Sequence, residues 1–102
     1  MTKEYEMMVI VSPRLNQEDA YGLNQKLLSI VTDNSGEIVK VDDWGKRILA
    51  YPINKVKEGY YYVDYFTLES TTVKLVKKQM NLNESIIRYM IINLSDKRRK
   101  NG

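Results

Sequence analysis

The sequence predicts an α+β fold with the element order βαββαβ, in which a four-stranded antiparallel sheet carries two helices on one face. Two observations predict it. Four segments rich in β-branched and aromatic residues alternate with two segments whose apolar residues recur at helical spacing. The chain has 102 residues, enough for one two-layer core and too few for two. We therefore expect a single domain of the ferredoxin-like arrangement over residues 1–95.

The first strand and the first helix have clear boundaries. Residues 3–12 are mostly β-branched, aromatic or apolar, and Pro13 ends the strand. Asn16 is a suitable N-cap for a helix over residues 17–33, which carries apolar side chains at helical spacing. We expect Gly36 to end that helix by adopting a positive φ.

The next two strands follow each other directly. Residues 37–53 are extended, and a bulge or bend is expected at Gly45. Pro52 places this strand at the edge of the sheet, because proline cannot donate to a neighbouring strand. A polar connection at 54–59 leads to a third strand over 60–68, which is rich in aromatic residues.

The alternation of residues along the third strand indicates which of its side chains face the helices. Tyr60 and Tyr62 share their parity with Phe66 and Leu68, so we expect this set to pack against the helices. One of the hydroxyl residues at 70–72 then caps a short helix.

The second helix and the last strand complete the order. Val73, Val76 and Met80 share one helical face, and Asn81 and Asn83 end the helix. The fourth strand is then expected over residues 86–94.

Composition excludes several classes of function. The chain has no cysteine and no histidine, which excludes disulfide frameworks, catalytic triads and most zinc sites. No run approaches the roughly 18 apolar residues of a membrane span. We expect a cytoplasmic, non-catalytic protein with no cofactor, no metal, no membrane association and no small-molecule substrate.

The net charge of +3 is concentrated at the C-terminus. Lys97, Arg98, Arg99 and Lys100 stand against Asp96, and the rest of the chain is formally neutral. Such a run of like charges favours a flexible tail that a polyanion can order. Residues 96–102 are therefore predicted to be a basic tail that contacts RNA, with a solubility tail as the alternative.

The sheet face without helices is predicted to bind a partner. Both parities of the first and fourth strands contain large apolar residues, so either assignment leaves an apolar patch that monomers rarely expose. Homodimerisation through this face is one alternative. The residues assigned to this open face are Met8, Ile10, Arg88, Met90 and Ile92.

Residues 44–53, WGKRILAYPI, are predicted to form an unusual strand that contains two consecutive cations, Lys46 and Arg47. Trp44, Lys46 and Arg47 are interpreted as a flat hydrophobic ring and two cations on one edge. Tryptophan and arginine are enriched where binding energy concentrates, so the block is predicted to be a contact surface.

One resemblance is to the RNA-recognition motif. Gly59 and the aromatic residues after it follow part of that motif's third strand, in which exposed rings stack on bases. Glu58 and Tyr61 depart from the motif, and it would require Tyr60 and Tyr62 to be exposed. A single-stranded RNA binder of this type is kept as an alternative.

The second resemblance covers nearly the whole chain. The opening from Tyr5 to Pro13, the block WGKRILAYPI at 44–53, Gly59-Tyr60 and the segment LNESIIRYM at 82–90 are similar to the bacterial small-subunit ribosomal protein S-six family. This resemblance implies a βαββαβ protein that binds small-subunit (16S) rRNA as a heterodimer with ribosomal protein S-eighteen. An acylphosphatase-like enzyme is a weaker alternative, because the loop around Arg14 lacks the glycines that would cradle an anion.

Two sets of residues are expected to carry this function. The family's basic and aromatic positions fall on Lys46, Arg47, Tyr51 and Arg88. The residues expected to bind RNA are Lys3, Tyr5, Arg88, Lys97, Arg98, Arg99 and Lys100. The residues expected at the partner interface are Met8, Trp44, Lys46, Arg47, Tyr51 and Met90.

Overall fold

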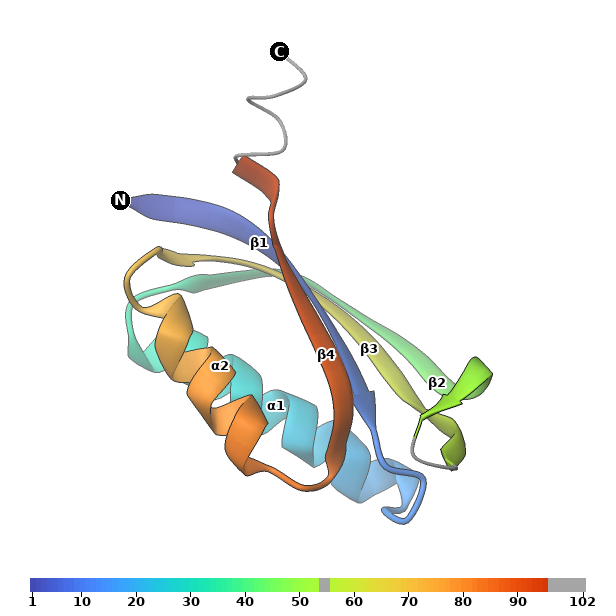
Figure 1. The fold of residues 1–102 in the computed structure, drawn as a ribbon. Helices are drawn as coiled ribbons and strands as arrows, with labels where there is room; N and C mark the ends of the chain where they lie inside the picture. Colours follow the sequence, from blue (N-terminus) through green and yellow to red (C-terminus); the bar gives the residue numbers. More distant parts are fainter. Residues whose placement is uncertain (54–55, 96–102) are drawn as a thin grey trace.

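A computed structural model of the protein describes residues 1–53 and 56–95, without the side chains of residues 50–56 (Figure 1). The sheet has the strand order β2-β3-β1-β4, and each neighbouring pair is antiparallel. Both helices lie on one face of the sheet (Figure 1). The predicted fold class is thus confirmed. The elements are β1 (Thr2–Val11), α1 (Gln17–Asp33), β2 (Glu37–Ile53), β3 (Val56–Glu69), α2 (Val73–Leu82) and β4 (Ile86–Asn93).

The core lies between the sheet and the two helices. Alternate residues of β1 and β3 face it, which confirms the predicted parity of the third strand. From α2, Val73, Val76 and Met80 are buried as expected. None of the described helices is long and apolar enough to cross a membrane. The strand residues that fill the core are Tyr5, Met7, Val9, Val11, Tyr60, Tyr62, Phe66 and Leu68.

Helix α1 begins as predicted and ends differently. The backbone N–H of Asp19 donates to Asn16 Oδ1 over 2.7 Å, which satisfies one of the free donors of the first turn. The prediction that Gly36 adopts a positive φ is wrong, because Ser35 takes that conformation with φ of 66°. Gly36 is needed for space instead: a Cβ there would lie 2.5 Å from the carbonyl oxygen of Thr67.

Strand β2 lies at the edge of the sheet and contains the expected bulge. Gly45 has φ of 71°, and the pairing with β3 shifts between Asp43 and Gly45. Trp44 is therefore the extra residue of the bulge. This irregularity lies directly before the two consecutive cations Lys46 and Arg47.

Candidate protein and RNA interface

The sheet face away from α1 and α2, here called the open face, is built from aligned rows of side chains. Residues directly paired in neighbouring strands point to the same face, so the strand register defines these rows. The central row runs from the edge strand β2 through β3 and β1 to β4. It consists of Asp42, Val63, Met8 and Met90.

Two further rows flank the central one. On one side the row contains Lys40, Tyr65, Glu6 and Ile92. On the other side it contains Gly45, Tyr61, Ile10 and Arg88. All five residues that the sequence assigned to the open face therefore occupy it. The face is apolar in the middle of β1, β3 and β4.

The apolar side chains of the open face differ in exposure. Met90 is 44% exposed and Met8 is half-buried, whereas Ile10 is only 3% exposed. The expectation that Ile10 contributes exposed apolar surface is therefore wrong. Its Cγ2 lies 2.7 Å from the position that a Cβ of Gly59 would occupy, so the missing side chain of Gly59 lets Ile10 lie close to β3. The accessible part of the patch is centred on the two methionines.

Trp44 extends the open face towards the β2–β3 hairpin. Its ring stacks on Tyr61 with centroids 6.3 Å apart and planes 12° from parallel, and it remains 50% exposed. The bulge places Trp44 next to the ring of the neighbouring strand. A shallow hollow of 530 Å³ is lined by Asp43, Trp44, Arg47, Ile48 and Tyr61.

Lys46 and Arg47 lie on opposite faces of β2. Arg47 pairs with Gly59 on the open-face parity, and its Nε donates to the carbonyl oxygen of Trp44 over 2.9 Å. Lys46 pairs with Tyr60, and its Nζ lies 5.5 Å from the centre of that core ring. Lys46 also forms an ion pair with Glu58 at 3.7 Å. Both cations thus lie on the edge strand, as interpreted from the sequence, but they point to opposite faces of it, because successive strand residues alternate.

The open face carries charges of both signs. Glu6 and Lys40 share the row at one end, and Lys40 forms an ion pair at 3.6 Å with Asp42 of the central row. Burial, followed by the charge and hydrogen bonding of Glu6, raises the pKa of Tyr65. Arg88 lies towards the other end, opposite Ile10. A partner therefore meets charges of both signs at one end and along β2, an apolar middle on β1, β3 and β4, and the cation Arg88 at the other end.

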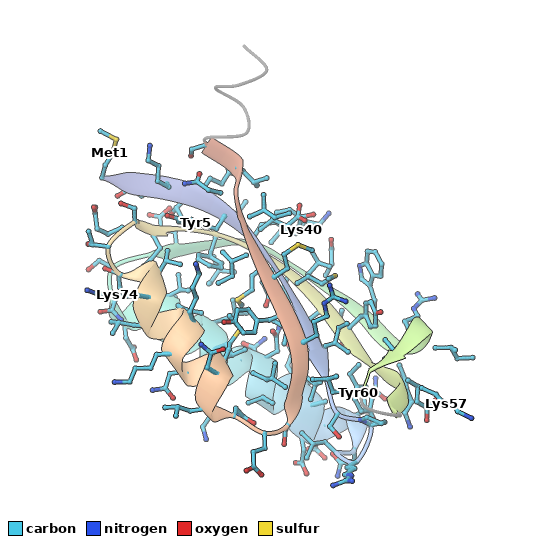
Figure 2. All side chains as sticks on the ribbon, in the orientation of Figure 1. Met1, Tyr5, Lys40, Lys57, Tyr60 and Lys74 are labelled. Carbon is cyan, nitrogen blue, oxygen red and sulfur yellow. The ribbon has the colours of Figure 1, made fainter. Side chains whose placement is uncertain are left out.

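The residues predicted to bind RNA do not form one cluster. Tyr5 is 5% exposed and lies in the core between sheet and helices, so its ring is not available to RNA in this structure (Figure 2). Lys3 is half-buried and shares the helix-facing parity of Tyr5. Arg88 lies on the open face, roughly 23 Å further along the sheet at about 3.3 Å per residue.

Several predicted site residues lie outside what the structure describes. The side chain of Tyr51 is among them, and so is the whole basic tail. The tail residues concerned are Lys97, Arg98, Arg99 and Lys100.

The open face carries aromatic rings other than those of the RNA-recognition motif. That motif needs Tyr60 and Tyr62 at the surface, and the structure buries them to 6% and 0% exposure. Tyr61 and Tyr65 occupy the open face instead, a consequence of the parity that the sequence already indicated. Within residues 1–53 and 56–95, no group of three or more histidine, cysteine or acidic residues could hold a metal ion.

Comparisons with known proteins place the chain in one family. Residues 4–93 match the family model described as ribosomal protein S6. The small ribosomal subunit protein bS6 of Desulforamulus reducens is 40% identical over 90 residues, which cover 88% of this chain and 95% of that protein. The corresponding protein of Paenarthrobacter aurescens is 42% identical over 96 residues, covering 94% and 95%.

A solved structure agrees with this assignment. The crystal structure of 30S ribosomal protein S6 from Thermotoga maritima superposes with a TM-score of 0.87 at 30% sequence identity, covering 99% of this chain and 98% of that one. The family match spans both the open face and the helices that leave it uncovered. The chain therefore belongs to the ribosomal protein S6 family.

Proposed function

We propose that this protein is a structural, non-catalytic component of the bacterial small ribosomal subunit, located in the cytoplasm, that binds 16S rRNA together with ribosomal protein S-eighteen. The observation that carries the proposal is the apolar middle of the open face in a chain of the ribosomal protein S6 family. Met8 and Met90 are directly opposite each other there, and Met90 is 44% exposed. Exposed patches of this kind mark sites of protein association.

The open face is suited to a protein partner more than to RNA directly. Its middle row offers two methionines, with the Trp44–Tyr61 pair beside it. Flexible methionine side chains adapt to a partner surface, and tryptophan is enriched among residues that dominate binding energy. We therefore assign Met8, Met90, Trp44 and Arg47 to the contact with S-eighteen, and leave Lys46 out of it.

The RNA contacts are proposed for cations around this surface. Arg88 at one end of the open face and Lys3 near the start of β1 would neutralise phosphates, together with the basic tail. Outside residues 96–102 the chain has equal numbers of basic and acidic residues. A neutral body supplies little non-specific attraction, so tight rRNA binding should require the partner protein.

The Met90→Glu variant tests the protein contact. A charge buried against an apolar partner surface is costly, so we expect at least about tenfold weaker binding of S-eighteen, measured by titration calorimetry. Leu82→Glu is the matched control, because Leu82 is 67% exposed at the end of α2 and should tolerate the same charge without effect on binding. Equal affinity of the two variants for S-eighteen would contradict the proposed interface.

Filter binding to the central domain of 16S rRNA tests the RNA contact. We expect weak retention by the isolated protein and tight retention by its mixture with S-eighteen, with a strong dependence on salt. Tight binding by the isolated protein would overturn the dependence on the partner. If adding S-eighteen did not increase the retention of rRNA, the proposal that the two proteins bind rRNA together would be overturned.

A further inference from the structure

A polar pair lies buried in the otherwise apolar core. Asn24 on α1 and Asp64 on β3 are both 0% exposed, and Asn24 Nδ2 donates to Asp64 Oδ1 over 3.0 Å. The two residues are 40 positions apart in the sequence. They form the polar side-chain contact through which α1 is held to the central part of the sheet.

One side-chain oxygen of each residue is not accounted for by this hydrogen bond. Asn24 Oδ1 and Asp64 Oδ2 are buried and have no hydrogen-bond partner among the described residues. Both are acceptors while the carboxyl group is ionised, so they cannot bond to each other. Leaving two buried acceptors unsatisfied, one of them charged, is unfavourable. One proton on Asp64 Oδ2 would remove the charge and supply the missing donor.

We propose that Asp64 is protonated in the folded protein and closes a cyclic acid–amide pair with Asn24, which acts as a pH-sensitive fastener between α1 and the sheet. The pair has two hydrogen bonds: Asn24 Nδ2–H donates to Asp64 Oδ1, and Asp64 Oδ2–H donates to Asn24 Oδ1. The proton comes from solvent and returns to it on ionisation, which leaves one hydrogen bond and a buried carboxylate.

The surroundings favour the neutral acid. Burial raises the pKa of Asp64 from 3.8 to about 7; the hydrogen bond from Asn24 opposes this rise and the negative charge of Asp42 adds to it. No cation among the described residues lowers this pKa. Met7 of β1, paired with Asp64, is uncharged. The titratable groups near the pair are Tyr60 and Tyr62 on the same strand, Tyr21 on α1, and Asp42 and Asp43 on β2.

The neighbouring phenol of Tyr62 does not change charge in the relevant range. Burial, followed by the charge of Asp43, raises the pKa of Tyr62 to about 12, so this phenol stays neutral near pH 7. Since Asp64 binds its proton more tightly in the folded chain than in the unfolded chain, folding takes up a proton between about pH 4 and pH 7. The stabilisation is complete below about pH 4 and is lost as the pH rises to about 7.

A carbon-detected NMR titration of the wild-type protein tests the proposal directly. We expect the side-chain carboxyl carbon of Asp64 to titrate with a midpoint near pH 7, and the side-chain amide of Asn24 to shift with the same midpoint. Titration of Asp64 near pH 4 would overturn the protonated state. An Asn24 amide that does not follow the titration would overturn the pair.

Unfolding of variants measures the consequence for stability. In wild type the unfolding equilibrium constant should rise by up to about tenfold per pH unit between pH 4 and pH 7, beyond the change shown by Asp64→Asn. Asp64→Asn keeps a group that can pair with Asn24 and cannot ionise in this range. The control Asp33→Asn removes an exposed carboxyl from α1, the helix that carries Asn24. This variant should keep the pH dependence of stability seen in wild type. Identical pH profiles for wild type and Asp64→Asn would contradict the proposal.

Hydrogen exchange tests the effect on the helix. Helix α2 is packed through the apolar residues Val73, Val76 and Met80 and provides an internal control for α1. Between pH 6 and pH 8 the protection factors of α1 should fall relative to those of α2 in wild type and stay level in Asp64→Asn. A constant ratio in wild type would show that the pair does not fasten α1. These measurements use the protein without partners, so their outcome is independent of the proposed ribosomal function.

Discussion

The two faces of the sheet both carry large apolar residues, but only one of them is covered by the helices. The covered face packs Tyr62, Phe66 and Leu68 of β3 against the helices, all at 0% exposure. The open face carries Met8 and Met90 in its central row, and no helix or strand among residues 1–53 and 56–95 covers it. Apolar residues on both parities therefore predict two packing interfaces, of which the described part of the chain covers one.

The two faces also differ in how they hold polar groups. The covered face encloses Asn24 and Asp64, where each atom needs a partner within the core. The open face carries its charged residues at its two ends and on the edge strand β2, where water or a partner can solvate them. The first arrangement adds to the stability of the fold, whereas the second leaves binding energy available for another molecule.

The largest expected difference is between deletions on the two faces. Phe66→Ala removes a fully buried ring that packs 5.7 Å from Tyr5, and it should lower the free energy of unfolding by about 3–5 kcal/mol. Met90→Ala truncates a side chain that is already 44% exposed and should cost less than about 1 kcal/mol. Urea unfolding followed by circular dichroism measures both. Similar losses would show that the open face is part of the protein's own core.

Two glycine substitutions should change the free energy of unfolding by smaller amounts, one lowering it and the other raising it. Gly59→Ala places a Cβ 2.7 Å from Ile10 Cγ2 and 3.0 Å from the carbonyl oxygen of Val11, so it should cost about 1–3 kcal/mol. Gly22→Ala in α1 meets nothing within 4 Å and should add about 0.5–1 kcal/mol of stability. Thermal unfolding of both variants checks the signs. Stabilisation by Gly59→Ala would mean that Ile10 is not held against β3 as described.

The sequence predicted the fold and the two faces for a simple reason. Period-2 and helical patterns depend on neighbouring residues, so the element order, the span of α1, the bulge at Gly45 and the helix-facing set of β3 could be predicted and are confirmed. The left-handed residue after α1 was misplaced by one position. Ser35 adopts it, whereas Gly36 is required for its close approach to the carbonyl of Thr67 in another strand.

The site could be predicted only in part, because its details depend on contacts between distant residues. Burial of Ile10 depends on Gly59 in the adjacent strand, and the pairing of Asn24 with Asp64 depends on how α1 lies across the sheet. The sequence offered no sign that Asp64 would pair with Asn24. Tyr5 was assigned to RNA although its parity, shared with Met7, already indicated the core.

The smallest expected effects separate the two cations of β2. Arg47→Ala should weaken binding of S-eighteen by about three- to tenfold, because Arg47 lies beside Trp44 on the open face. Lys46→Ala should leave that affinity unchanged, because Lys46 lies over Tyr60 on the other side of the strand. Its own cost should be below about 1 kcal/mol of folding stability and should shrink with added salt, since its ion pair with Glu58 is solvent-exposed. Equal losses of affinity in the two variants would mean that the partner wraps around the edge of β2 and contacts both faces.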